Sequence, residues 1–362
     1  MTPSRRQLRR EMESLEPPVL RAFLEMMREA ADQINIGGLT AALSAGDTFR
    51  AVELASMSPA TLNITTEALR DAYVKAGIYH VGNLPKRRGG GRFVIAFDVR
   101  NPRAEAHLAR ESSRFVTAIV NEQREAIRVA VTAGAELGNN PRRTALDIVG
   151  RINRATGRRQ GGIVGLTGQQ SGYVAQMREA LQGADRVGWA RNRSGNLVQK
   201  FWLDENGAVQ SVYTRRDKRF DRSIKAALQS GSPMPAERID RAVSSYSNSL
   251  LQLRGENIAR TETLSAFNTA NYESLQQLTD HGVPREAVKR TWVTSRDGRE
   301  RETHADADGQ QVGLDEPFQV GGVMMMHPGE MGAPAEEVIN CRCSVRTEVD
   351  YVAIELAERQ AA

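Results

Sequence analysis

Two cysteines and one histidine near the end of the chain are the residues best suited to chemistry. Cys341 and Cys343 are separated by one residue in N-C-R-C, and His304 ends the segment R-E-R-E-T-H. Zinc prefers thiolate and imidazole ligands, and a C-x-C pair can share one ion, with Asp306 or His327 as a fourth ligand. Alternatively, the cysteines are small buried apolar groups and His304 hydrogen-bonds within a turn. We expect no cofactor, with zinc as the candidate exception.

These cysteines are not expected to form a disulfide. In a strand, two residues separated by one position point to the same side about 6.6 Å apart, which exceeds the Cβ spacing of a bridged pair. They should be reduced thiols or metal ligands. The segment H-A-D-A-D-G that follows Thr303 is too short for a calcium loop, which needs further oxygen ligands and a distal carboxylate.

Polar residues also interrupt the apolar face of a helix that begins near Glu256. Arg260 and Asn271 recur at helical spacing with Leu264 and Phe267, so all four share one face. A buried guanidinium needs carboxylate or carbonyl partners. We therefore expect a fixed polar network between this helix and the sequence that follows it. Its expected members are Arg260, Thr261, Glu262, Asn271, His304, Asp308 and Asn340.

A catalytic interpretation of the same region assigns Arg260, Thr261, Glu262, Glu302 and His304 to a site in which paired carboxylates do acid–base work. However, residues 351–359 have the pattern of one amphipathic helix, which leaves no room for an effector domain. A network that locks the region explains the polar set more economically. We therefore predict that the protein is not an enzyme.

A block of arginines in the middle of the chain is a candidate binding surface. Between residues 142 and 193 there are ten arginines and three acidic residues, whereas the whole chain has a net charge of only +5. Such a block favours phosphate or an acidic protein surface. A solvated helical face is the alternative, because few aromatic side chains interleave for base stacking. The candidate contacts with DNA or an acidic partner are Arg142, Arg143, Arg151, Arg154, Arg158 and Arg159.

The elements that must position these residues are mostly helical. We expect a helix over residues 1–35 with a break at Pro17-Pro18 and a stop at Gly37-Gly38. Further helices are expected at 40–54, at 58–76 behind a Ser58-Pro59 cap, and at 102–136, which we expect to be the longest. Thr167 and Gln170 have the spacing of a capping box for another helix.

A β-hairpin interrupts this helical body. Residues 196–213 alternate around D-E-N-G, where Asn206-Gly207 would supply the positive φ angles of a tight turn. Helices at 220–229 and 235–253 follow, and the latter runs nearly without interruption into the helix that carries Arg260.

The last part of the chain has a different pattern. Lys289–Thr294 alternates like a strand, Asp297-Gly298 and Asp308-Gly309 mark turns, and residues 321–334 are rich in Gly and Pro. Cys341, Cys343 and Val345 should point to one side of a closing strand. We therefore predict a mainly α fold: an elongated helical body with an inserted hairpin and a small C-terminal α+β domain.

Length and composition agree with a soluble protein of several regions. The 362 residues, 40% of them hydrophobic, can form more than one core. No apolar run is long enough for a bilayer, and residues 1–10 lead into no secretory signal, so we expect synthesis in a cytoplasm and no membrane partner. The expected regions are 1–138 (helical), 139–255 (arginine-rich, with the hairpin at 196–213), 256–350 (α+β) and 351–362 (tail).

In the order and spacing of its motifs, the C-terminal region resembles the Mu F-like minor head proteins, a head-morphogenesis family of tailed phages. The resemblance rests on about ninety residues and extends more weakly upstream to about Asn140. Its motifs are I-A-R-T-E-T (258–263), Trp292, R-E-R-E-T-H (299–304), Asp308-Gly309, Pro317-Phe318, Gly321-Gly322 and N-C-R-C (340–343).

The resemblance implies a structural and assembly protein of the virion. It implies incorporation into the procapsid, association with the portal, capsid or scaffold proteins, and a role near packaged DNA and its ejection. The expected location is the head interior or the portal vertex, with assembly in the host cytoplasm. Two alternatives stay open: an enzyme of the ADP-ribosyltransferase type, because related phage head proteins can be fused to toxin domains, and a free-standing nucleic-acid-binding protein.

Overall fold

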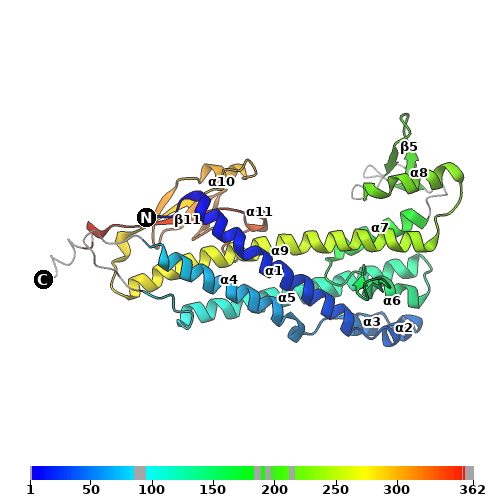
Figure 1. The fold of residues 1–362 in the computed structure, drawn as a ribbon, viewed down its shortest axis with the longest axis horizontal. Helices are drawn as coiled ribbons and strands as arrows, with labels where there is room; N and C mark the ends of the chain where they lie inside the picture. The colour runs from blue at the N-terminus through cyan, green and yellow to red at the C-terminus, as the bar shows by residue number, and fades with distance from the viewer. Residues whose placement is uncertain are drawn as a thin grey trace. The chain divides into compact units, whose positions relative to one another are not determined.

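The computed structural model describes residues 2–84, 95–182, 189–191, 197–199, 201–211, 217–352 and 354 (Figure 1). The chain divides into two compact units, each assembled from segments that are distant in sequence. Unit 1 comprises Met1–Phe23, Leu62–Phe115 and Gly255–Ala362, and unit 2 comprises Leu24–Thr61 and Val116–Arg254. The four consecutive regions expected from the sequence stay a prediction, although unit 1 resumes at Gly255, next to the expected boundary at 255/256.

The described residues are mostly helical, which confirms the predicted mainly α fold. Three of the four unit boundaries fall inside continuous helices, α1 (Arg5–Gln33), α5 (Pro102–Glu136) and α9 (Ala236–Asp280), and the fourth falls in the 3-10 turn η1 (Pro59–Leu62). The helices and 3-10 turns are α1 Arg5–Gln33, α2 Ile36–Ser44, α3 Thr48–Ala55, η1 Pro59–Leu62, α4 Asn63–Gly82, α5 Pro102–Glu136, α6 Pro141–Val149, α7 Gly168–Gln182, η2 Lys218–Phe220, α8 Asp221–Ser230, α9 Ala236–Asp280, η3 Arg285–Ala287, α10 Glu302–Asp306 and α11 Ala335–Val338.

The strands are short and antiparallel. In the C-terminal region, β11, β7 and β8 form a three-stranded sheet in that order, and β9 pairs with β10. Three further pairs, β1–β2, β3–β4 and β5–β6, lie in the middle of the chain. The strands are β1 Arg151–Ile152, β2 Arg159–Gln160, β3 Trp189–Arg191, β4 Leu197–Gln199, β5 Phe201–Leu203, β6 Val209–Ser211, β7 Val288–Val293, β8 Gln311–Gly313, β9 Phe318–Val320, β10 Val323–Met325 and β11 Ser344–Val349.

The predicted break in the first helix at Pro17-Pro18 is wrong, because α1 runs through both prolines. A proline removes one helical N–H donor, so the carbonyls of Glu13 and Ser14 lose their usual partners. Both of those residues are exposed, and water can satisfy their carbonyls. The buried stripe of Met12, Leu15 and Val19 spans the two prolines and holds the helix together.

The predicted stop at Gly37-Gly38 is also wrong, since both glycines lie in the first turn of α2. Asn35 begins that helix by accepting a hydrogen bond from the Gly38 N–H at 3.0 Å. The single helix predicted at 40–54 is two helices, α2 and α3. They are separated at Gly46, whose φ is +70°, and α3 is capped by Asp47.

Several local predictions in unit 2 are confirmed. The Thr167 side chain accepts a hydrogen bond from the Gln170 N–H at 3.2 Å, and the Gln170 side chain accepts one from the Thr167 N–H at 3.1 Å. This reciprocal pair is the predicted capping box at the start of α7. The helix predicted over 102–136 has those bounds in α5, although α9, with 45 residues, is longer.

The hairpin predicted over 196–213 is shorter than expected. Only β5 and β6 pair around the D-E-N-G turn, whereas β4 pairs with β3. In the turn, Gly207 has a φ of +69° but Asn206 does not share a positive φ. A hairpin loop with a single residue of positive φ needs only one glycine, which Gly207 supplies. The prediction that Asn206 also has a positive φ is therefore wrong. Residues 212–213 lie outside the described residues, as does most of the predicted helix at 351–359.

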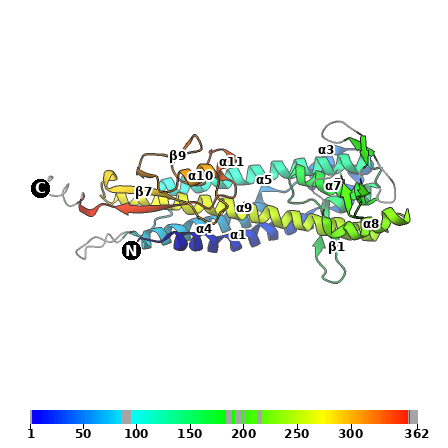
Figure 2. The ribbon, with the colours of Figure 1, turned by 90° about the horizontal axis from the view of Figure 1, so that it is seen from above.

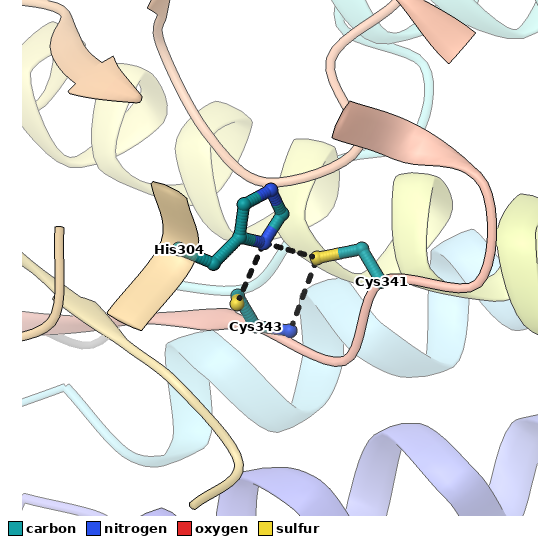
Figure 3. Close-up of side chains that lie close together, drawn as sticks. All are labelled: His304, Cys341 and Cys343. Atoms are coloured by element: carbon teal, nitrogen blue, oxygen red, sulfur yellow. Dashed lines mark hydrogen bonds between the residues drawn. The ribbon is translucent and has the colours of Figure 1, made fainter. Parts of the chain in front are cut away.

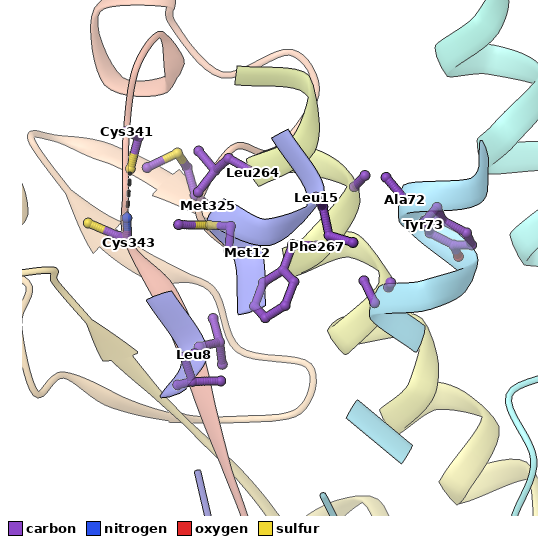
Figure 4. Close-up of a cluster of buried hydrophobic side chains, with 14 of the residues drawn as sticks. Leu8, Met12, Leu15, Ala72, Tyr73, Leu264, Phe267, Met325, Cys341 and Cys343 are labelled. Carbon is purple, nitrogen blue, oxygen red and sulfur yellow. Dashed lines mark hydrogen bonds between the residues drawn. The ribbon is translucent and has the colours of Figure 1, made fainter. Parts of the chain in front are cut away.

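The core of unit 1 joins four parts of the chain (Figure 4). Leu8 and Met12 of α1, Tyr73 of α4 and Phe267 of α9 are at most 2% exposed and belong to one apolar cluster. Cys341 and Cys343 lie at an edge of the same cluster. The C-terminal sheet is therefore packed against helices that come from the beginning of the chain.

The C-terminal sheet lies along the second half of α9 (Figure 2). The strand predicted at 289–294 is confirmed as β7, which pairs with β11 from Val288↔Val349 to Val293↔Ser344. The predicted alternation through the cysteines is wrong: β11 begins at Ser344, which is buried, and both cysteines precede it. Asn340, with a φ of +58°, turns the chain immediately before them.

Within the described residues, no helix is long and apolar enough to cross a bilayer.

Candidate functional site

The C-terminal region is attached to α9 by two buried asparagines. Asn268 donates to the carbonyl of Cys343 at 3.1 Å, and Asn271 donates to the carbonyl of Val345 at 3.0 Å. The Thr347 hydroxyl donates to the Asn271 side-chain oxygen at 3.4 Å. Asn271 thus satisfies backbone and side chain of β11, which fixes where that strand and the preceding cysteines lie.

His304, Cys341 and Cys343 lie together in the interior (Figure 3). His304 comes from the short helix α10, and both cysteines come from the loop ahead of β11. The His304 Nδ1 atom is 3.3 Å from the Cys343 Sγ and 3.4 Å from the Cys341 Sγ. Each of the three residues is 2% exposed. The structure therefore brings His304 next to the two cysteines, which are distant from it in sequence, and the three side chains are potential zinc ligands.

Glu337 completes this cluster, and no sequence pattern indicates its part in it. The His304 Nε2 atom is 2.8 Å from a Glu337 carboxylate oxygen, which also accepts a hydrogen bond from Thr303 at 3.0 Å. Gly321 makes room for this carboxylate, since a Cβ at Gly321 would lie 2.4 Å from it, and its φ is +54°. Glu337 looks like an ordinary surface residue of P-A-E-E-V, so only its burial reveals the role.

Electrostatics favour charge separation within the cluster. The hydrogen bond from the Cys343 thiol lowers the pKa of Cys341 to about 5 against the effect of burial, and His304 adds to the lowering. The hydrogen bond to Cys341 and burial raise the pKa of Cys343. Burial opposes protonation of His304, but its contact with Cys341 outweighs this and raises the pKa of the imidazole. Cys341 is thus the more readily ionised thiol.

Neither residue suggested as a fourth zinc ligand belongs to the cluster. Asp306 is exposed on α10. The His327 imidazole lies 3.3 Å from the Thr269 hydroxyl and 3.2 Å from the Pro328 carbonyl oxygen. Burial lowers the pKa of His327 to about 4, so this imidazole is neutral.

Arg260, Thr261 and Asn340 form a second, separate group. The Arg260 guanidinium donates to the Asn340 side-chain oxygen at 3.0 Å and lies 3.7 Å from a Glu16 carboxylate oxygen. The Asn340 N–H donates to the Thr261 hydroxyl at 3.1 Å. The Arg260 side chain is 24% exposed, so it is only partly buried. These contacts fasten the turn before the cysteines to α9 and α1.

Asp308 forms a third group, in the connection between β7 and β8 and shortly before β8. It accepts hydrogen bonds from Arg5 at 2.9 Å, from Arg296 at 2.7 Å and from the Thr294 N–H at 2.8 Å. Burial raises the pKa of Asp308, but these bonds outweigh it and hold the pKa well below its ordinary value. The carboxylate is therefore fully ionised and attaches α1 to the sheet.

Glu262 forms a fourth group and borders a small cavity. Its carboxylate accepts a hydrogen bond from Arg114 of α5 at 2.7 Å. Burial raises the pKa of Glu262 although Arg114 lowers it. The cavity has a volume of about 110 Å³, and Tyr73, His107 and Glu111 also line it, whereas Arg260 does not. The seven residues expected to form one network are thus divided. Six of them lie in four separate groups, those of His304, of Arg260 with Thr261 and Asn340, of Asp308 and of Glu262, and Asn271 belongs to none of these.

Arg290 is a buried arginine of the C-terminal region that sequence reasoning missed. It is 1% exposed and donates to the carbonyls of Gly313, Glu316 and Met326. Its guanidinium stacks 5.2 Å from the ring centroids of both Tyr272 and Phe318. In K-R-T-W-V, strand alternation with Trp292 is the signal that would have placed Arg290 inside.

The arginine block in unit 2 is divided between paired and exposed side chains. Arg143 and Arg151 lie 3.8 and 3.5 Å from carboxylate oxygens of Asp240, and Arg151 also bonds to Asp147 at 2.8 Å. Arg159 bonds to Asp32 at 2.9 Å. The remaining candidates, Arg142, Arg154 and Arg158, are exposed. Acidic residues from other segments thus offset much of the local positive charge.

Comparison with protein families confirms the resemblance. Residues 218–346 match the family model described as phage Mu protein F like protein. This match contains the cysteine cluster, Arg260 and most of the three-stranded sheet, since β11 extends beyond residue 346. The chain therefore carries a region that is similar to phage Mu protein F.

Two curated relatives overlap with parts of the chain. A stretch of 102 residues, 27% of this chain, is 35% identical to the NAD(+)–arginine ADP-ribosyltransferase EFV of Enterococcus faecalis. A stretch of 168 residues, 45% of this chain, is 26% identical to the uncharacterized protein YqbB of Bacillus subtilis. The chain covers 20% of the first relative and 48% of the second. No solved structure matches the chain.

Proposed function

We propose that this protein is a phage minor head protein, a component of the virion that acts in head assembly without catalysis. The observation that carries the proposal is the Mu F-like match over residues 218–346. The polar residues of that region are engaged by the protein itself, in the groups around His304, Arg260, Asp308 and Arg290. A region of this kind presents a rigid outer surface, as a docking element does.

The partner we propose is the portal protein or a neighbouring capsid or scaffold protein of the procapsid. Among the described residues, the Mu F-like region has four large apolar side chains at its surface: Leu253, Met324, Met331 and Ile339 are 44%, 60%, 37% and 47% exposed. Methionine is enriched at protein interfaces because its side chain adapts to the opposing surface. We propose that Met324, the most exposed of the four, contacts the partner.

Co-purification tests this proposal. The tagged full chain would be co-expressed with the portal protein of the same phage, and recovery of portal would be measured after nuclease treatment at low and raised salt. We expect recovery to survive nuclease and to fall strongly for Met324→Lys. Ile78→Lys is the matched control, because Ile78 is 59% exposed but lies on α4, outside the matched region. No recovery at low salt would refute the portal assignment.

An ADP-ribosyltransferase function is the second candidate, since a relative of that name shares 35% identity over 102 residues. The overlap includes only 20% of that protein. The cavity beside Glu262 has a volume of about 110 Å³, whereas pockets for small ligands measure roughly 300–1,000 Å³. We expect equal, background release of nicotinamide from NAD by the wild type and by Glu262→Gln. Turnover that Glu262→Gln abolishes would establish the enzyme instead.

A further inference from the structure

We propose that His304, Cys341 and Cys343 bind one zinc ion, which ties α10 to the loop ahead of β11. The three donor atoms lie within 4.8 Å of one another. Zinc binds sulfur at about 2.3 Å and nitrogen at about 2.0 Å, so two such donors on a tetrahedral ion lie roughly 3.5 Å apart. The nitrogen–sulfur distances of 3.3 and 3.4 Å are close to that value. Figure 3 shows all three side chains converging on one point.

Glu337 can orient the His304 imidazole. In metal sites, a carboxylate often accepts the hydrogen bond of the ring nitrogen that does not bind the metal, and so fixes the ring. Because Nε2 faces the Glu337 carboxylate at 2.8 Å, the proton lies on Nε2 and the lone pair of Nδ1 faces the two sulfur atoms. Trp292 packs edge-to-face on the same ring at a centroid distance of 5.7 Å and restricts its rotation. The ligand and its supporting contacts are therefore in place without rearrangement.

The backbone also supports a thiolate at this point. The Cys343 N–H donates to the Cys341 sulfur at 3.3 Å, and such a donor stabilises negative charge on sulfur. Two thiolates would neutralise the charge of the ion, which removes the cost of burying it. A nucleophilic role for Cys341 is less suitable, because all three side chains are 2% exposed and a substrate cannot reach them.

The ligand set selects zinc over hard cations. Magnesium and calcium prefer oxygen ligands, whereas two thiolates and one imidazole suit zinc. Among the residues that the structure describes, no fourth His, Cys, Asp or Glu atom joins the group. We assign the fourth position to water. The ion would link the connection between β7 and β8 to the loop between α11 and β11. Both have little regular structure, so binding would contribute directly to folding.

The zinc content of the full chain, purified without chelators, tests this proposal. Elemental analysis should give one zinc per chain in the wild type. It should give none in Cys341→Ser or Cys343→Ser. His281→Gln, which removes an exposed histidine of the same region, should retain the metal. Glu337→Gln keeps all three ligands and should weaken zinc binding by about 10–100-fold.

A second measurement uses only the wild type, so it tests the proposal even if the cysteine variants fail to fold. In the wild type, both thiols should resist a thiol-reactive probe until a strong chelator removes the ion, and cobalt should then restore protection and give thiolate charge-transfer absorption. A folded chain that takes up no zinc even after incubation with it overturns the proposal. So does thiol reactivity that is the same with and without chelator, or a Cys341–Cys343 disulfide in the folded protein.

Discussion

At the residue scale, one buried arginine explains how the C-terminal region holds its loops. Arg290 is fixed by three carbonyl groups and two aromatic rings, whereas the arginine singled out from the sequence, Arg260, is partly exposed. The helical spacing correctly placed Arg260 near a polar partner. Strand alternation with Trp292 could have indicated that Arg290 is buried, but not which carbonyls receive its guanidinium, because those carbonyls belong to loops distant in sequence.

Replacing Arg290 should destabilise the protein strongly. Arg290→Leu would leave the carbonyls of Gly313, Glu316 and Met326 without this donor, and each unsatisfied buried group costs about 1–3 kcal/mol. We expect the free energy of unfolding to fall by about 3 kcal/mol or more, measured by urea denaturation. Arg346→Ala on the neighbouring strand, where the side chain is 43% exposed, should change it by less than about 0.5 kcal/mol. Equal effects would refute the assigned role.

Asp308 should make stability depend on pH. Its folded-state pKa lies below the ordinary value of 3.8, so it stabilises the fold above that pH and loses the effect as pH falls toward the lower folded-state pKa. We expect Asp308→Asn to be less stable than the wild type near neutral pH, with the difference shrinking below pH 3.8. Denaturation curves above and below this pH measure it, and the exposed Asp306→Asn is the control. A pH-independent difference would contradict the account.

Among the helices and strands, sequence patterns predicted correctly those features that depend only on residues close together in the chain. The capping box of α7 and the bounds of α5 followed from spacing alone, because caps and amphipathic stripes are properties of neighbouring residues. The prediction at Pro17-Pro18 failed because burial of Met12 and Val19 overrides a local penalty. The cysteine cluster was predicted by residue type, but its partner Glu337 depends on a tertiary contact that no spacing encodes.

The turn between β1 and β2 is where DNA contact is testable. Arg154 and Arg158 are exposed there, while Arg143, Arg151 and Arg159 have acidic neighbours. If the block meets DNA, the double variant Arg154→Ala/Arg158→Ala should lower the slope of log affinity against log salt by about one per lost phosphate contact. Arg50→Ala, an exposed arginine elsewhere in unit 2, should leave the slope unchanged. An unchanged slope in the double variant would argue for a solvated face.

At the scale of the whole molecule, the compact units do not follow the order of the sequence. The Mu F-like region lies partly in unit 1, where its apolar face is covered by α1 and α4. Composition and periodicity indicate that the chain is mainly helical and which face of a helix is apolar. They do not show which faces meet, and therefore consecutive regions were the simplest expectation.

This arrangement predicts that the C-terminal segment cannot fold alone. In a fragment of residues 255–352, Leu264 and Phe267 would lose the cover of Leu8, Met12 and Tyr73. Each buried side chain of this size contributes about 1.5–3 kcal/mol, and a whole domain is stable by only about 5–15 kcal/mol. We expect the fragment to aggregate or to bind a hydrophobic dye, while the full chain does neither. A monomeric fragment with a cooperative unfolding transition would contradict this.

If the proposed function is right, the chain is a structural component of a phage head. Quantitative mass spectrometry of purified, nuclease-treated procapsids, assembled with and without the portal protein, can measure this. We expect the chain at low copy number in particles that contain the portal and depletion of the chain from particles that lack it. If the chain is missing from both kinds of particle, the proposed function is wrong.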